Sequence, residues 1–170
     1  TRSNSNRAEE LTIQAKELSA LNVIASKLSN LSLQLYSIIL KTGYVKNEKE
    51  NQYIKEYFHN RLPNFEISEL GFREKLWLYK AHLWYSFLTQ DFLNCYKYAS
   101  KWVELFYENP LMINSHPVFF LKGNNYLLES LFFIRRKDKF QKILNRLERI
   151  IISEGFPSDN NIEALSFLYV

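Results

Sequence analysis

Apolar residues recur along nearly the whole chain at intervals of three and four, which is the period of an α-helix with one buried face. In the first stretch, the positions with this spacing are Leu11, Ala15, Leu18, Leu21 and Ala25. Isolated Gly, Pro and Asn residues separate the stretches, and Asn30 is expected to cap the second one. The pattern predicts helices at about residues 6–28, 31–43, 48–60, 70–88, 92–108, 117–134 and 138–152, and the start of an eighth near Asn160.

The part of the chain between residues 70 and 152 shows an internal repeat. A shift of 48 residues places the apolar positions of 92–103 on those of 140–151, and it places 72–85 on 120–133. A single helical hairpin cannot bury its apolar face, so repeated hairpins are expected to stack on one another. The sequence therefore predicts an all-α fold, an α-solenoid of stacked antiparallel helical hairpins with about seven to eight helices.

Some of the repeated positions resemble the tetratricopeptide repeat (TPR). Phe92 matches the aromatic residue that opens the second helix of that repeat, Tyr79 its large aromatic in the first helix, and Cys95 its small alanine. Leu83 and Trp102 stand where the family has Gly and a second Ala, and 48 residues exceeds the usual repeat of about 34. The resemblance implies a TPR-like stack with longer helices.

Two stretches, 35–49 and 95–128, are similar to a group of longer, uncharacterised bacterial TPR-like proteins. This resemblance spans roughly residues 31–150. Together with the repeat it leads to the expectation of one TPR-like domain over 1–170, with hairpins at about 31–60, 70–108 and 117–152. It also implies that the chain is an internal part of a longer array. The apolar end of the sequence, without a helix cap, leads to the same expectation. No activity comes with the resemblance.

Composition agrees with long helices and few turns. Only four Gly and four Pro occur, while hydrophobic residues make up 46% of the chain, which excludes a disordered protein. The net charge of +4 permits an acidic partner without identifying one. Cys95 is the single cysteine, so a cytoplasmic location is expected, and no uncharged apolar run suggests a membrane partner.

The sequence offers no pattern typical of catalysis, metal binding or cofactor binding. His59, His82 and His116 lie far apart without the spacing of a zinc site. The glycines are isolated, which argues against a phosphate-binding loop, and Cys95 lies on an apolar stripe rather than at a helix start. We therefore expect a protein that is not an enzyme and that holds no cofactor.

Two polar surfaces are candidates for binding. By resemblance to TPR arrays, where the first helix of each pair lines a peptide groove, the groove candidates are Lys75, His82, Ser86, Lys122, Asn125 and Glu129. The alternative is that these side chains form hydrogen bonds between neighbouring hairpins. A basic stripe on and before residues 138–152 is the second candidate, with Arg135, Arg136, Lys139, Lys142, Arg146 and Arg149. The alternative there is a solvated outer face.

The leading hypothesis is a protein–protein interaction scaffold that presents a groove to a peptide or partner domain. The second hypothesis is a nucleic-acid or acidic-partner binder that uses the basic stripe, since phosphate contacts need clustered Lys and Arg. A third is a structural spacer between flanking domains.

Overall fold

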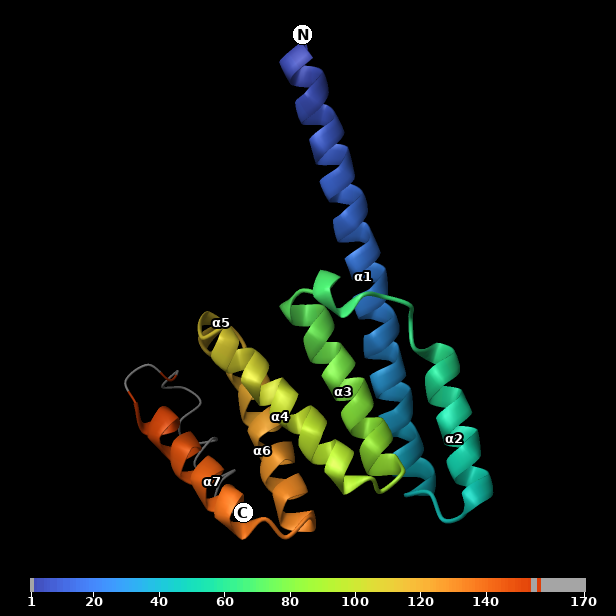
Figure 1. The fold of residues 1–170 in the computed structure, drawn as a ribbon, viewed down its shortest axis with the longest axis vertical. Coiled ribbons are helices and arrows are strands. Elements are labelled where there is room, and N and C mark those ends of the chain that lie inside the picture. The colour runs from blue at the N-terminus through green and yellow to red at the C-terminus, as the bar shows by residue number, and fades with distance from the viewer. Residues whose placement is uncertain (1, 154–155, 157–170) are drawn as a thin grey trace.

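In the computed structural model, the residues described are 2–153 and Phe156. Over them the chain forms α-helices and one short 3-10 turn, without a β-strand, so the all-α prediction is confirmed (Figure 1). The helix expected near Asn160 lies outside the described residues. The elements are α1 (Arg2–Thr42), α2 (Glu48–Arg61), η1 (Ile67–Glu69), α3 (Phe72–Leu88), α4 (Phe92–Glu108), α5 (Leu111–Ser115), α6 (Pro117–Phe133) and α7 (Lys137–Ile152).

The first helix differs from its prediction. Asn30 does not cap a second helix, because α1 runs unbroken from Arg2 to Thr42. Asn is only a weak helix breaker, and the segment contains no Gly or Pro before Gly43. Leu28, Leu31 and Leu35 on either side of Asn30 are fully buried, so packing holds this part of α1 helical. The helix ends at Gly43, as expected, with a φ of 75°.

The short helix α5, Leu111–Ser115, was not expected from the sequence. Five residues are too few to show a period of three and four, so no pattern could indicate it. It lies between α4 and α6 and leads into Pro117, the first residue of α6, which was expected there.

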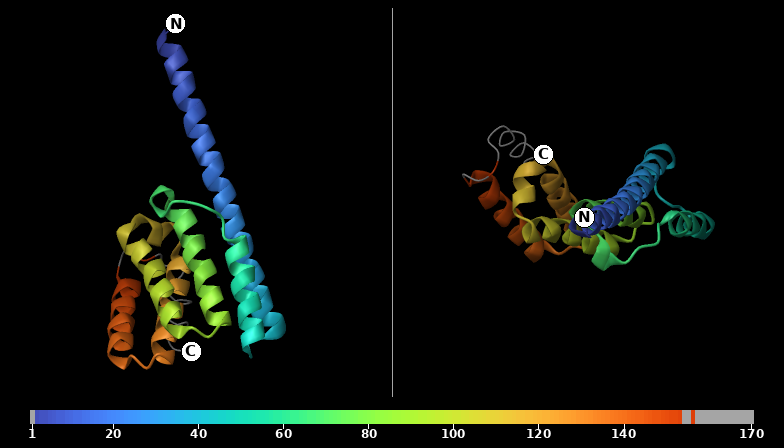
Figure 2. Two further views of the ribbon diagram at one scale, coloured as in Figure 1. Left: turned by 45° about the vertical axis from the view of Figure 1, so that its right-hand side comes forward. Right: turned by 90° about the horizontal axis from the view of Figure 1, so that it is seen from above.

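The helices form two sets that run in opposite directions. Helices α3 and α6 run parallel to the lower half of α1, while α2, α4 and α7 run the other way (Figures 1 and 2). Packing follows the order α1, α3, α4, α6 and α7, in which each helix packs on the next. The helix α2 contacts α1 only lightly, which fits the weaker repeat signal of this hairpin.

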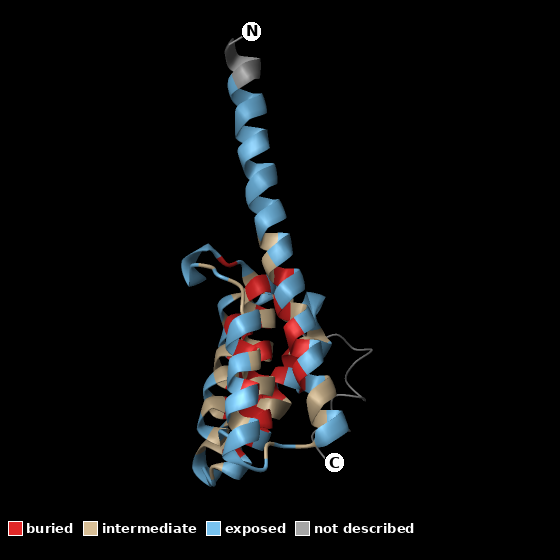
Figure 3. Cartoon of the chain, turned by 90° about the vertical axis from the view of Figure 1, so that its right-hand side faces the viewer, coloured by how far each residue is buried: buried red, intermediate tan, exposed pale blue. Residues whose placement is uncertain are grey.

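The N-terminal half of α1 projects from the other helices. Residues 6–20 are all exposed, and Figure 3 shows this part of the helix in solvent along its whole length. The expectation that Leu11, Ala15 and Leu18 form a buried face is therefore wrong, because none of the other described helices covers them. Burial begins at Ala25, which is 6% exposed.

By length and composition alone, the stretch Asn6–Thr42 of α1 is long and apolar enough to cross a membrane. The core helix of a water-soluble protein passes the same test. Leu28, Leu31 and Leu35 of this stretch are packed inside the fold, and 28% of its most apolar 18-residue segment is buried. The length and composition of α1 therefore do not decide whether the protein contacts a membrane.

Helix ends recur at a shorter interval than the sequence suggested. The helix α6 begins 45 residues after α3 begins, and α7 begins 45 residues after α4 begins. The turns also correspond, because Gln90 and Arg135 both have a φ of 58° and follow the same pattern of backbone hydrogen bonds. A difference of three residues is almost one helical turn, so apolar stripes coincide at either interval.

Trp102 of α4 belongs to the largest cluster of buried apolar residues in the described part of the chain. Its side chain is fully buried, and its Nε1–H donates to the Phe119 carbonyl oxygen of α6 at 3.0 Å. The indole lies directly against Gly123, where a Cβ atom would stand 2.6 Å from Trp102 Cδ1. The absence of a side chain at Gly123 therefore allows α4 and α6 to approach closely.

Candidate functional site

Three places on the described surface are considered as sites for a ligand. The first, which we call the inner face, combines exposed or half-buried side chains of the three parallel helices. Aromatic rings join the helices across it, with 4.8 Å between the ring centroids of Tyr36 and Trp84 and 5.4 Å between those of Trp84 and Tyr126. Its members are Leu33, Tyr36 and Leu40 of α1, Trp77, Lys80 and Trp84 of α3, and Lys122, Tyr126 and Glu129 of α6.

Charges on the inner face are unevenly distributed. The Lys80 ammonium lies 4.7 Å from the Trp77 ring centroid, and partial burial together with nearby Lys122 lowers the pKa of Lys80. On the next turns of α6, burial raises the pKa of Glu129, and burial with the Glu129 charge raises that of Tyr126 to about 12. One end of the inner face is thus cationic and the other anionic.

The structure divides the predicted groove residues between two sides of α3 and α6. Lys122 and Glu129 lie on the inner face, and Asn125 is half-buried between them on the same side of α6. His82 and Ser86 are elsewhere, on the side of α3 that faces α2 and α4, and Lys75 shares their helical spacing. The six residues therefore do not line one groove.

His82 is packed between aromatic rings. Its imidazole stacks on Tyr98 of α4, with ring centroids 4.2 Å apart, and meets Phe58 of α2 edge-on at 4.9 Å. Burial lowers the pKa of His82 to about 4, with smaller contributions from Lys97, His59 and Lys101. Ser86 is buried and donates to the His82 carbonyl oxygen at 2.7 Å. Both side chains serve the packing of α3.

The second place is a recess between α4 and α7, which we call the α4–α7 recess. Its volume is about 200 Å³, and it brings together Lys139, Lys142 and Arg146 of the predicted basic stripe. Lys139 Nζ donates to the Tyr96 hydroxyl at 3.2 Å, and the Arg146 guanidinium lies 3.6 Å from the Tyr107 ring centroid. These two cations are therefore positioned by tyrosines of α4.

The other three basic residues do not join this recess. Arg135 and Arg136 lie in the turn before α7, and Arg136 pairs with Asp138 at 3.5 Å. The hydrogen bond from Arg136 lowers the pKa of the Asp138 carboxyl. Arg149 is exposed on α7 and is not among the residues that line the recess. The predicted stripe thus separates into a turn cluster, a recess and one outlying arginine.

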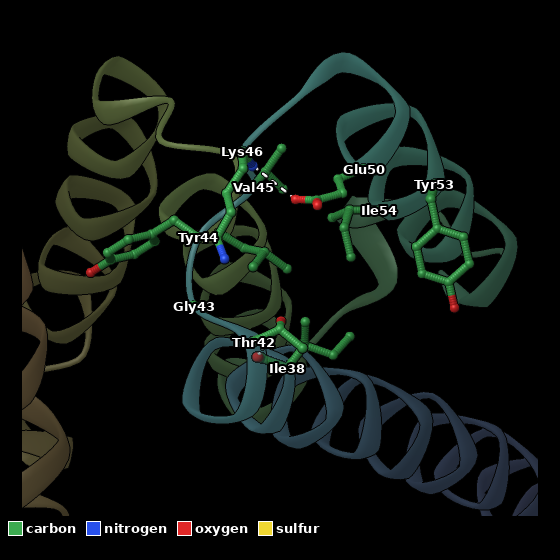
Figure 4. A pocket seen from close by; sticks show the side chains of 10 residues that line it. Ile38, Thr42, Gly43, Tyr44, Val45, Lys46, Glu50, Tyr53 and Ile54 are labelled. Carbon is green, nitrogen blue, oxygen red and sulfur yellow. Dashed lines mark hydrogen bonds between the residues drawn. The ribbon is translucent and has the colours of Figure 1, made fainter.

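The third place is a pocket of about 410 Å³ where the α1–α2 turn meets the end of α3 (Figure 4). Tyr44 and Tyr53 stand at opposite sides of it, and Glu50 accepts a hydrogen bond from the Lys46 backbone N–H at 2.9 Å. Asn47 in turn accepts from the Glu50 backbone N–H at 2.9 Å. Glu50 is thus used to cap α2.

Sequence reasoning missed this pocket because its lining comes from three separate elements. The one local signal was the spacing of Asn47 and Glu50, which is typical of a capping box and indicates a helix start. That signal predicts the turn, and the pocket depends on how α3 packs beneath it.

None of the three places has the arrangement of a catalytic centre. Within the described residues, no group of three His, Cys, Asp or Glu side chains could hold a metal ion. The thiol of Cys95 is fully buried, and burial, with a smaller effect of Asp91, raises its pKa to about 12. A thiol in this environment stays protonated at neutral pH and is a poor nucleophile.

Comparison with known proteins adds no relative. No protein-family model matches the sequence, and no curated protein or solved structure is significantly similar to the chain.

Proposed function

We propose that this protein is a protein–protein interaction module whose inner face binds a peptide or an extended segment of a partner. The observation that carries the proposal is the row of Tyr36, Trp84 and Tyr126, whose rings contact one another across three helices. Aromatic side chains that are rigidly held and partly exposed are typical anchors of protein interfaces. The proposed role is binding, without a catalytic step.

The chemistry of the inner face indicates what it would bind. Leu33 and Leu40 are 56% and 68% exposed, so they offer apolar surface that an apolar side chain of the partner would cover. Lys80 and Lys122 favour a carboxylate at their end of the face. We therefore expect the ligand to combine one or two large apolar side chains with an acidic group.

A TPR-like arrangement of the hairpins is part of this proposal. The interval of 45 residues supports it, because it pairs Trp102 with Leu147 and Phe106 with Ile151, and all four residues are almost fully buried. In such a stack the first helices of successive hairpins, here α1, α3 and α6, share one face. The inner face is made of these three helices.

A peptide-display selection tests the proposal. The protein is immobilised, random peptides are selected on it, and the binding site of an enriched peptide is mapped by hydrogen exchange. We expect added protection around residues 33–40, 77–84 and 122–129. Failure to enrich any peptide would contradict the proposal, as would protection confined to α2, α4 and α7.

A further inference from the structure

The α4–α7 recess has an apolar floor beneath a cationic rim. Four apolar side chains line it from three helices, namely Val103, Leu127, Leu131 and Ile143. Lys139, Lys142 and Arg146 stand along one side of it on α7, and among the described residues that line it Glu104 is the only acidic one. The lining therefore carries a net positive charge over an uncharged floor.

The dimensions of the recess limit what can enter. About 200 Å³ equals the liquid volume of about seven water molecules, at about 30 Å³ each, which suits one large side chain. Lys139 and Arg146 are seven residues apart on α7, which separates them by about 10 Å along the helix axis. An extended peptide covers that distance in about three residues.

We infer that the α4–α7 recess binds an acidic peptide segment of a partner, which inserts one apolar side chain between flanking carboxylates. The apolar side chain would contact Ile143 and Leu131, while the carboxylates would meet Lys142 and Arg146 at the rim. This surface is distinct from the inner face, so the inference does not depend on the proposed function.

The same observations favour an acidic peptide over a nucleic acid. A nucleic acid is held mainly through its phosphates by a continuous row of Lys and Arg along its backbone. Here Arg136 is paired with Asp138 and Arg149 lies outside the recess, so the basic residues of α7 do not form such a row. An apolar floor in a narrow recess instead matches a side chain with acidic neighbours.

Fluorescence polarisation of labelled probe peptides tests the inference. The probe carries one Phe flanked on each side by two Glu in a Gly/Ser background. One control peptide replaces the four Glu by Gln, and another replaces the Phe by Gly. We expect the probe to bind and each control to bind at least about tenfold more weakly, because each lacks one of the two recognised features.

Protein variants then locate the site. Lys142→Glu reverses a charge on an exposed side chain of the rim, and Ser100→Phe fills the recess without changing its charge. Each is expected to weaken probe binding by about tenfold or more. Lys49→Glu on α2 is the matched control, since it makes the same charge change away from the recess and should leave binding unaltered.

Three results would overturn the inference. The first is no measurable binding of the probe, and the second is that the Lys142→Glu and Ser100→Phe variants bind the probe as tightly as the wild type does. The third is that the protein prefers a short oligouridylate to the probe and that this binding depends steeply on salt. The last result would identify the surface as a nucleic-acid site. Leu33→Asp on the inner face should leave probe binding unchanged, so failure here is distinguishable from failure of the proposed function.

Discussion

Gly123 shows how a single residue sets the distance between two helices. A Cβ atom at this position would lie 2.6 Å from Trp102 Cδ1 and 2.7 Å from Trp102 Nε1. Since Trp102 is fully buried and its Nε1–H is hydrogen-bonded to the Phe119 carbonyl, the indole cannot move aside without losing that bond. The close packing of α4 on α6 therefore depends on this glycine.

We predict that Gly123→Ala lowers the free energy of unfolding by about 1–3 kcal/mol through overpacking, even though Ala favours a helix over Gly. Urea denaturation followed by tryptophan fluorescence measures the effect. Lys122→Ala, on the preceding exposed position of α6, is the control and should change stability little. A Gly123→Ala protein as stable as the wild type would contradict the described contact.

His82 predicts a dependence of stability on pH. Its pKa falls from 6.5 to about 4 in the folded protein, so the folded state binds fewer protons than the unfolded state between these values. Stability contributed by neutral His82 is thus fully present above about pH 6.5 and is lost as the pH falls toward 4, by up to roughly 3 kcal/mol.

A comparison of pH profiles isolates this contribution from that of the carboxyl groups. His82→Gln should show a smaller loss of stability between pH 6.5 and pH 4 than the wild type. Parallel profiles for the wild type and His82→Gln would show that His82 is not held neutral by its surroundings.

At the scale of elements, the three hairpin turns share one backbone requirement. In the described part of the chain, positive φ angles occur at Gly43, Gln90 and Arg135, which follow α1, α3 and α6. For a residue with a Cβ atom, this left-handed conformation costs about 1 kcal/mol or more in free energy. Glycine avoids this cost, so only the first of the three turns has the residue that suits it.

We therefore predict that Arg135→Gly raises the midpoint of thermal unfolding and that Gly43→Ala lowers it, each by an amount corresponding to about 1 kcal/mol. Differential scanning calorimetry measures both. An unchanged or lower midpoint for Arg135→Gly would indicate that the Arg135 side chain contributes more than the strain costs.

The same elements show what could be predicted from the sequence. Gly43 led to a correct helix end and Pro117 to a correct helix start, because the backbone preferences of glycine and proline act locally, whatever packs around them. The continuity of α1 through Asn30 could not be predicted, because it depends on α3 covering Leu28, Leu31 and Leu35. Exposure of Leu11 and Leu18 could not be predicted either, since helical spacing shows which residues share a face and not whether another helix covers it.

The sequence identified only some of the neighbours of the candidate binding residues, for a similar reason. Spacing along α7 correctly placed Lys139, Lys142 and Arg146 together, because residues three and four apart share one side of a helix. It could not show that Tyr96 and Tyr107 position two of them, since these rings come from α4. His82 was assigned to the groove for its polarity, and the spacing within α3 could not show that Phe58 of α2 and Tyr98 of α4 pack against it.

For the whole molecule, the central proposal is that α1, α3 and α6 together form one binding face. The direct measurement is the affinity, by titration calorimetry, of a display-selected peptide for the wild type and for a Leu33→Asp, Lys122→Glu double variant. Leu93→Asp is the control, because Leu93 is an exposed residue of α4 away from the inner face. We predict that the double variant binds the peptide at least about tenfold more weakly than the wild type and that the control binds it with unchanged affinity. Equal affinity of the wild type and the double variant would contradict the proposed binding face.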